Sequence, residues 1–317
     1  MRKQTAAIYA IGHFLVDFSC SYLLLSRQPD PWLFIVYNFC AFALQMPIGL
    51  LADMTGRNRT FALSGIALVL SGLLPLPMTA RVLLAGIGNA CYHVGGGRES
   101  LLKDNKLTGL GLFVSPGALG IFLGSFLSTI DWITLPAIAL LALLFLLVIR
   151  FCNAEKLLRI VRKPDWTTAA LMFSVVLLRS FIGMCMQTPW KIGIFAILGA
   201  VATAAGKLLG GIAADRLGSR PTGVSSLLLA AVLFLFPNSG IAGVTGCLLF
   251  QMTMPVTLKN ASSATPGYEG FSFGLLTFAL FLGYLPAAAG MHISPTVASL
   301  LCVVSAAMLL HRRKCHD

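Results

Sequence analysis

The sequence contains few charged residues. Only 11% of its 317 residues are Asp, Glu, Lys or Arg, whereas 57% are hydrophobic, and the mean hydropathy is +0.86. A soluble domain of ordinary composition has about a quarter of its residues charged. The composition therefore excludes a soluble globular protein and predicts an integral membrane protein.

Cysteine spacing and enzyme motifs are also missing. The eight cysteines contain no CxxC pair and no zinc-ligand spacing, so we interpret them as small packing residues rather than as disulfides or metal ligands. They are Cys20, Cys40, Cys91, Cys152, Cys185, Cys247, Cys302 and Cys315. We recognise no HExxH motif, no nucleophile elbow, no P-loop and no extramembrane domain that could hold a cofactor, so we expect neither an enzyme nor a bound cofactor.

Long apolar runs recur from one end of the chain to the other. A helix of about 17 to 25 apolar residues crosses a bilayer. The expected spans are 5–26, 32–52, 60–78, 82–97, 107–129, 133–151, 167–187, 192–214, 222–236, 240–258, 270–290 and 293–311. The first run is too long and too polar in its middle for a cleaved signal peptide. We therefore predict an all-α membrane protein with twelve transmembrane helices.

The net charge of +12 could indicate a nucleic-acid partner, so its distribution matters. Of the 23 Lys and Arg residues, eighteen fall on the N-terminal side of the twelve-span topology. The positive-inside rule then places both termini in the cytoplasm. We expect a multi-pass protein of a bacterial inner membrane with no nucleic-acid partner.

Two loop segments match each other. The segment "GLLADMTGRNR" at 49–59 aligns with "GIAADRLGSR" at 211–220, with a constant shift of 162 residues. Because this shift is about half the chain, we expect two six-helix halves in parallel orientation. The predicted domains are 1–152 and 166–317, joined by a basic cytoplasmic linker at 153–165.

This loop, with Gly, a small residue, Asp, Gly and then Arg, resembles the signature loop of the major facilitator superfamily. It occurs after the second span of each half, which is its place in that fold. The resemblance implies two pseudo-symmetric six-helix bundles and a gating role for the charged loop residues. By this resemblance the gating residues are Asp53, Arg57, Arg59, Asp215, Arg216 and Arg220. The alternative is a charged turn that only fixes topology.

The fourth span has a narrower resemblance. Gly86, Gly88, His93 and Arg98 in "GIGNACYHVGGGR" reproduce the spacing found in fosmidomycin-resistance-type efflux proteins, although the Pro-Glu of that group is absent. The glycines of the fifth span, Gly117, Gly120 and Gly124, are similar to the same group's fifth helix. Small residues at spacings of three and four also allow close helix packing, which is the first explanation for them.

Ionisable and amide side chains inside the spans are few, and each is a candidate functional residue because burying it in a membrane is costly. They are His13, Asp17, Asn38, Asn89, His93, Arg179, Gln187, Lys207 and Gln251. Most lie on the first, fourth, seventh and tenth spans, which line the central cavity in the superfamily. Substrates bind there, near the bilayer midplane.

Asp17 and Arg179 are related by the same shift of 162 residues. We expect them at equivalent depths on facing cavity helices, as candidates for an ion pair that protonation of Asp17 would break. His13, one helical turn before Asp17, shares its face, so both are assigned to proton coupling. The alternative is a static pair that fixes helix packing, and His93 could simply bond to Asn89 or to a backbone carbonyl.

The remaining polar residues, Arg179, His93, Asn89, Gln187, Gln251, Lys207 and Asn38, are assigned to substrate binding. The expected cavity is cationic, so the substrate is a small anionic or amphiphilic molecule. The sequence favours a monomeric, proton-coupled secondary transporter, and export follows from the family resemblance. The alternatives are a proton symporter that imports an anionic nutrient, and a transporter-like receptor or lipid-handling protein without solute turnover.

Overall fold

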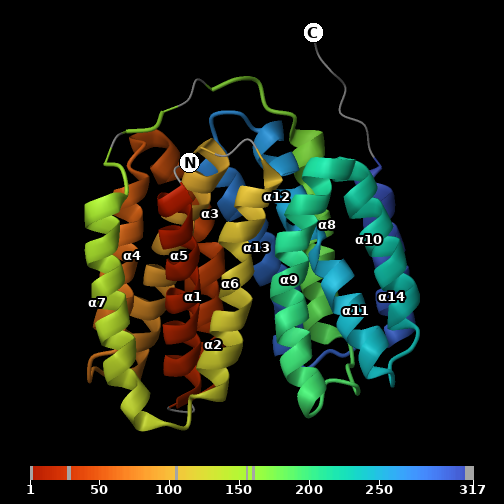
Figure 1. Cartoon of the computed structure of the whole chain (residues 1–317), viewed down its shortest axis with the longest axis horizontal. Helices are drawn as coiled ribbons and strands as arrows, with labels where there is room; N and C mark the ends of the chain where they lie inside the picture. The colour runs from red at the N-terminus through yellow and green to blue at the C-terminus, as the bar shows by residue number, and fades with distance from the viewer. Residues whose placement is uncertain (1–2, 27–29, 104–105, 155, 159–160, 311–317) are drawn as a thin grey trace.

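A computed structural model of the chain describes residues 3–26, 30–103, 106–154, 156–158 and 161–310 (Figure 1). Within this part the helices are α1 (Lys3–Ser26), α2 (Pro31–Asn38), η1 (Phe39–Ala43), α3 (Gln45–Thr55), α4 (Asn58–Gly72), α5 (Met78–Lys103), α6 (Leu107–Phe126), η2 (Asp131–Ile133), α7 (Thr134–Phe151), α8 (Trp166–Cys185), α9 (Ile194–Leu217), α10 (Ser219–Phe234), α11 (Gly240–Gln251), α12 (Thr253–Ala264), α13 (Glu269–Ala288) and α14 (Pro295–Leu309). Cys315 lies outside the described residues.

These elements form twelve membrane-crossing segments, as the sequence predicts. Two segments are interrupted. In one, the π-helical turn η1 joins α2 to α3, and in the other α11 is followed directly by α12. Eight described segments are long and apolar enough to cross a membrane. The chain is a multi-pass integral membrane protein with an all-helical fold.

Proline accounts for both interruptions. Pro47 and Pro255 have no N–H group for the carbonyl four residues earlier, and their rings crowd it. Before Pro47 the chain widens into the π-helical turn η1, in which the Leu44 N–H donates to the Phe39 carbonyl at 3.2 Å. Before Pro255 the helix breaks at Met252. Such π-helical turns are frequently found at functional sites.

Helix ends follow from local chemistry. The side chains of Asp165, Ser239 and Ser294 cap α8, α11 and α14 by accepting backbone N–H groups at 3.1, 3.3 and 3.3 Å. Gly56, with φ of +69°, ends α3 in the left-handed conformation that glycine adopts without strain.

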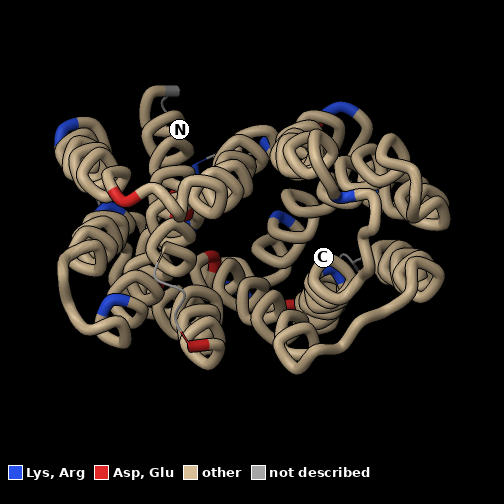
Figure 2. The backbone as a smooth tube through the Cα atoms, turned by 90° about the horizontal axis from the view of Figure 1, so that it is seen from below, with Lys and Arg blue, Asp and Glu red and all other residues tan. Residues whose placement is uncertain are grey.

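The helices from α1 to α7 lie on one side of the molecule and those from α8 to α14 on the other (Figure 1). The backbone seen from below also divides into two groups of helices, and few residues along it are charged (Figure 2). The two groups meet along α6 with α9 and along α3 with α13. The described part of the linker crosses the end where α3, α12 and α13 come together (Figure 1). We call this the linker side of the protein.

The structure corrects the bounds of two predicted spans. The fourth span, expected at 82–97, extends through α5 to Lys103, so Arg98 and Glu99 lie inside a helix and are buried. The seventh span, expected to reach 187, ends at Cys185, so Gln187 lies beyond the end of α8. The glycine-rich helices pack closely as expected: a Cβ at Gly120 would overlap the carbonyl of Phe14 in α1.

Candidate functional site

A cavity of about 480 Å³ lies between the two groups of helices. Its polar lining residues are Asp17, Ser21, Asn38, Arg179, Ser180, Lys207 and Gln251, and its apolar walls include Phe34, Phe42, Met184, Met254 and Leu280. The α1 lining runs from Asp17 to Leu25, the half of that helix remote from the linker side. A cavity of this size and composition suits a small amphiphilic molecule.

Asp17 is held at the edge of this cavity by side chains from two helices. Its Oδ2 atom lies 3.2 Å from His13 Nε2 in α1, and its Oδ1 atom lies 3.5 Å from His93 Nε2 in α5. Asn89 Nδ2 donates a hydrogen bond to Oδ1 at 2.9 Å. All four side chains are buried, so the carboxylate is surrounded by donors in an environment nearly free of water.

The two histidines of this group also face each other. Their Nε2 atoms are 2.9 Å apart, and the Nδ1 atom of His93 lies 2.8 Å from the Asn89 carbonyl oxygen. We call His13, Asp17, Asn89 and His93 the histidine cluster. One ring nitrogen of each histidine and one carboxylate oxygen of Asp17 lie within 4.8 Å of one another. His93 thus makes the backbone-carbonyl contact of the alternative interpretation, and it contacts His13 as well.

The cationic residues of the cavity come from the other group of helices. Arg179 in α8 is buried, and its Nη2 atom donates to the thioether sulfur of Met254. Its Nη1 atom has no hydrogen-bond partner among the described residues. Lys207 of α9 lines the same cavity. Neither side chain lies within 4.0 Å of a described carboxylate, so two cations face the cavity without an ion pair.

The expected ion pair between Asp17 and Arg179 is absent from this structure. Both residues line the cavity, as their positions in the repeat predict, but Asp17 is already held by the histidine cluster. Gln187 does not lie with the other candidates: it lines a small separate pocket near Trp190 and Pro295. Asn38 and Gln251 line the cavity, and Asn38 Nδ2 also donates to the Phe34 carbonyl in its own helix.

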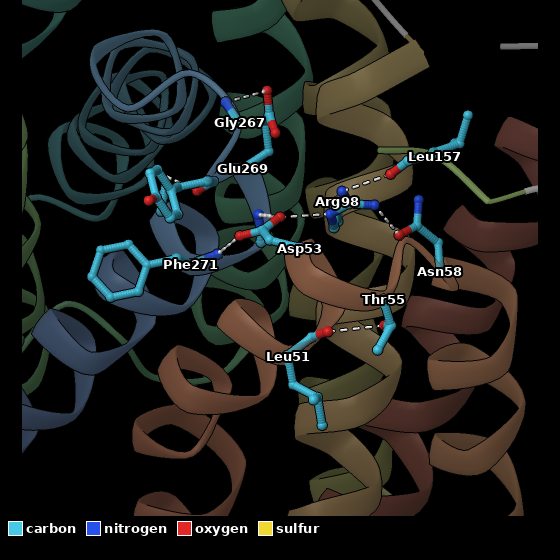
Figure 3. Close-up of polar contacts among 12 residues, drawn as sticks. Leu51, Asp53, Thr55, Asn58, Arg98, Leu157, Gly267, Glu269 and Phe271 are labelled. Atoms are coloured by element: carbon cyan, nitrogen blue, oxygen red, sulfur yellow. Dashed lines mark hydrogen bonds and ion pairs between the residues drawn. The ribbon is translucent and has the colours of Figure 1, made fainter. Parts of the chain in front are cut away.

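Asp53, which the sequence places in a loop, lies in the last turn of α3 and joins the two groups of helices on the linker side (Figure 3). Its carboxylate pairs with Arg98 Nε at 2.6 Å and accepts the backbone N–H groups of Gly270 and Phe271, each at 2.8 Å. These two groups belong to the first turn of α13, where a helix end favours a negative charge. Asp53 therefore closes the cavity's linker side by holding an element of the other half.

Asp215, from the second loop, makes the reciprocal contact. It accepts the N–H groups of Leu107 and Thr108, at the start of α6, at 2.8 and 2.9 Å, and the Thr108 hydroxyl at 2.5 Å. The shift of 162 residues that relates Asp53 to Asp215 also relates Thr108 to Gly270. The two contacts share this one donor position, whereas the second N–H group comes from Leu107, before Thr108, in one contact and from Phe271, after Gly270, in the other. They differ in side chains, because the same shift takes Arg98 to Asn260.

The arginines of the two loops are less buried than Arg98. Arg57, Arg216 and Arg220 are exposed, and Arg59 is partly buried with its Nε atom unpaired. The basic partner of the first loop is Arg98, which is fully buried and also donates to Asn58 Oδ1 and to the Leu157 carbonyl at 2.7 and 2.8 Å (Figure 3). Both aspartates that the resemblance selected therefore contact the other group of helices. The arginine paired with Asp53 comes from α5 and not from either loop.

Sequence reasoning missed several residues around Arg98. Glu99 accepts from Asn58 Nδ2 at 2.7 Å and pairs with Lys103 at 2.6 Å, and Leu157 brings the linker onto the same site. The available signal was the charged pair Arg98–Glu99 directly after an apolar span. The predicted end of that span at 97 placed both residues in a loop.

Contrary to the expectation that the sequence has no nucleophile elbow, the segment Gly270–Gly274 reads "GFSFG", which has the letters of that motif. In the structure Ser272 lies in the first turn of α13 and donates to the Tyr268 carbonyl at 2.8 Å, with Thr265 as its other partner. A nucleophile elbow instead lies at a strand-to-helix turn beside a histidine. Ser272 is therefore a structural hydroxyl.

Comparison with known proteins finds the fold but no sequence relative. No protein-family model matches the chain, and no curated protein matches it. Among solved structures it is similar to a variant of the Escherichia coli fucose:proton symporter FucP, with a TM-score of 0.67 and 14% identity. It is also similar to FucP in the outward conformation, with a TM-score of 0.65 and 13% identity.

A third similar structure is a bacterial homologue of the iron transporter ferroportin in an outward-facing state, with a TM-score of 0.60 and 14% identity. Each of the three alignments covers 96% of this chain and 96% of the other. The narrower similarity to fosmidomycin-resistance-type proteins finds no support in these comparisons. The chain therefore has the major facilitator fold.

Proposed function

We propose that the chain is a proton-coupled secondary transporter that moves a small amphiphilic organic anion by alternating access. In this proposal the halves 1–152 and 166–317 rock about the cavity, and the linker at 153–165 joins them on the cytoplasmic side. The structure then corresponds to a state open away from the cytoplasm. The protein works as a monomer in a bacterial inner membrane.

The observation that carries the proposal is the buried Nη1 atom of Arg179, which has no hydrogen-bond partner among the described residues. A buried donor without a partner costs about 1–3 kcal/mol, and more when it is charged. A substrate carboxylate would satisfy the Nη1 atom and receive the fixed fork of hydrogen bonds that guanidinium offers. Lys207 adds a second positive charge, and the apolar walls accommodate a hydrophobic body.

Proton coupling is assigned to Asp17 and His13. Their buried cluster lies at the edge of the same cavity, so a proton bound there changes the charge that the substrate meets. Asn89 and His93 support this site, and Asn38 and Gln251 add polar contacts for the substrate. Asp53 and Asp215 are assigned to the gate.

Export is our preferred direction, and it comes from the family resemblance. Inside-out vesicles with an acidic lumen test it: an exporter that exchanges substrate for protons concentrates the substrate in that lumen. The second candidate is uptake by proton symport, which the similarity to the fucose:proton symporter fold favours. A symporter would not concentrate the substrate in the same vesicles.

A thermal-shift series identifies the anion. We expect 4-phenylbutyrate, used as a probe carboxylate with an apolar body, to stabilise the wild type and to lose this effect in Arg179→Ala. 4-Phenylbutanol, which has the same body without the charge, is the control. Equal stabilisation by both compounds would contradict the anion assignment. A chain that binds such probes but carries no solute would instead be a receptor or lipid-handling protein.

A further inference from the structure

The histidine cluster contains enough contacts to assign its protons. His93 Nδ1 lies 2.8 Å from the Asn89 carbonyl oxygen, and a carbonyl can only accept. The Nδ1 atom therefore carries the hydrogen, and Nε2 of the neutral ring carries a lone pair. This is the less usual tautomer of histidine, and here the backbone of α5 imposes it.

The tautomer of His13 follows from that of His93. The two Nε2 atoms are 2.9 Å apart, so one of them must donate, and only His13 is able to. Its Nε2–H group also faces Asp17 Oδ2 at 3.2 Å. The Nδ1 atom of His13 then carries a lone pair, and it has no partner among the described residues.

One further proton has three places to bind. At His13 Nδ1 it would be buried without an acceptor. On Asp17 it would neutralise a carboxylate that already accepts from Asn89 at 2.9 Å and from His13, and hydrogen bonds of this kind favour the charged form. At His93 Nε2 the new N–H group would point at Asp17 Oδ1, which lies 3.5 Å away.

We infer that the coupling proton binds to His93 Nε2 and that Asp17 stays ionised as its counter-charge. This inference rests on the proposed proton coupling and changes the carrier from Asp17 to His93. Asn89 is the positioning residue, since its carbonyl fixes the tautomer and its amide holds the carboxylate.

Protonation has a mechanical consequence in this geometry. Once both Nε2 atoms carry hydrogens, a separation of 2.9 Å brings two donors together, so the His13 ring must move away from His93. His13 and Asp17 already fill the space that Gly117 of α6 leaves, because an added Cβ would overlap His13 Nε2 and Asp17 Oδ2. Proton binding thus forces apart a tightly packed contact between α1 and α5.

Other titratable and charged groups surround the histidine cluster: Tyr92 lies edge-on to the His93 ring, and Cys20 interacts electrostatically with Asp17. Tyr37 from α2 and Lys207 from α9 interact electrostatically with Asp17, and Arg179 from α8 interacts with Lys207. Phe113 of α6 packs on the His13 ring with centroids 4.9 Å apart. Lys207 is already cationic, so loading a proton on His93 is favoured when a substrate anion neutralises Lys207 and Arg179. Proton and anion binding would then reinforce each other.

Nitrogen-15 NMR of histidine-labelled protein in nanodiscs tests the inference without any substrate. The chain has five histidines, and His13→Gln and His93→Gln assign the two signals. We expect neutral His93 with a protonated Nδ1, neutral His13 with a protonated Nε2, and conversion of His93 to imidazolium as the pH falls. A neutral His93 protonated on Nε2 would overturn the assignment.

Infrared spectroscopy supplies a second readout that does not depend on the folding of a histidine variant. If Asp17 carries the proton, a carboxylic-acid carbonyl band should appear on acidification and disappear in Asp17→Asn. Such a band would overturn the inference, and its absence supports it. Titration with Zn²⁺ covers the metal alternative: stoichiometric binding that is lost in His93→Gln would show a metal site there and would also overturn it.

Transport separates this inference from the proposed function. In proteoliposomes with 4-phenylbutyrate, His93→Gln should lose the response of transport to a pH gradient, whereas His292→Gln, at an exposed position, should keep it. If the wild type moves no protons with this probe, the proposed function fails. If the wild type does so and His93→Gln does too, only the assignment to His93 fails.

Discussion

Asp17 and Arg179 occupy equivalent positions in the two halves and line one cavity, yet each is held by its own half. Asp17 is surrounded by donors from α1 and α5, whereas Arg179 has only a thioether as partner. The carboxylate is therefore satisfied and the guanidinium is not. In our proposal this asymmetry separates two roles, with proton binding in one group of helices and anion binding in the other.

Replacing the guanidinium tests the anion half. We expect Arg179→Gln to weaken binding of 4-phenylbutyrate by about 10- to 100-fold, because hydrogen bonds to charged groups contribute about 1.5–3 kcal/mol each. Isothermal titration in detergent measures the change. Lys207→Gln is the matched control, with a smaller loss expected because a lysine offers a point charge without the planar fork. Equal affinity in Arg179→Gln and wild type would exclude Arg179 as the anchor.

The contacts of Asp53 and Asp215, which we assign to the gate, should differ in strength. Asp53 combines a buried ion pair to Arg98 with two backbone N–H groups, whereas Asp215 has N–H groups and a hydroxyl in a more exposed place. Removing one partner of a buried ion pair costs about 3–5 kcal/mol. We expect Asp53→Asn to open the linker side far more than Asp215→Asn does.

Thiol labelling measures this opening. A cysteine placed at Gln45, a buried position where α3 packs on α13, should react faster in the Asp53→Asn background than in the Asp215→Asn background, each compared with its parent. Each background carries the same eight native cysteines, which the parent controls account for. Equal acceleration in both would mean that Arg98 does not distinguish the two contacts.

The close packing of α1 on α6 can be tested at Gly120. A Cβ there would overlap the Phe14 carbonyl, and neither helix backbone can yield cheaply. Overpacking of this kind costs about 1–3 kcal/mol, so Gly120→Ala should lower the unfolding temperature in detergent. Gly183→Ala is the control, because no atom lies within 4 Å of its added Cβ. A Gly120→Ala protein as stable as Gly183→Ala would contradict this packing.

Much of the fold could be predicted from the sequence because it depends on local properties. Apolar runs predict twelve segments, and the repeated segments contain Asp53 and Asp215, each of which contacts the other group of helices. Pro47 and Pro255 could have indicated the breaks near Leu44 and Met252, because a proline disrupts the turn before it.

The contacts between helices could not be predicted in the same way. Spacing along α1 places His13 beside Asp17. It cannot predict the contact with His93, which lies 80 residues away on α5 and comes close only because the two helices pack together. Symmetry suggested Arg179 as the partner of Asp17, and it failed because the histidines and Asn89 of the same half are closer. Arg98 was missed for a different reason: the hydropathy of α5 falls near its end, although the helix continues to Lys103.

Gly117 tests whether the histidine cluster needs the space that α6 leaves beside it. An alanine there would push His13 Nε2 and Asp17 Oδ2 from their positions, since the added Cβ overlaps both atoms. We expect Gly117→Ala to disturb the contact between the two imidazoles and to abolish the response of transport to a pH gradient. Affinity for 4-phenylbutyrate at neutral pH should change less, because Arg179 lies on another helix.

The matched control for this variant is Gly120→Ala, one turn further along the same helix. It also adds a Cβ between α6 and α1, but against the backbone of Phe14 and not against the cluster. Both variants should lose stability, while only Gly117→Ala should lose the pH response and the distinctive nitrogen-15 signal of His93. If both variants lose the pH response, the cause is disturbed packing of α1 on α6 and not the histidine cluster, because Gly120→Ala leaves the cluster untouched.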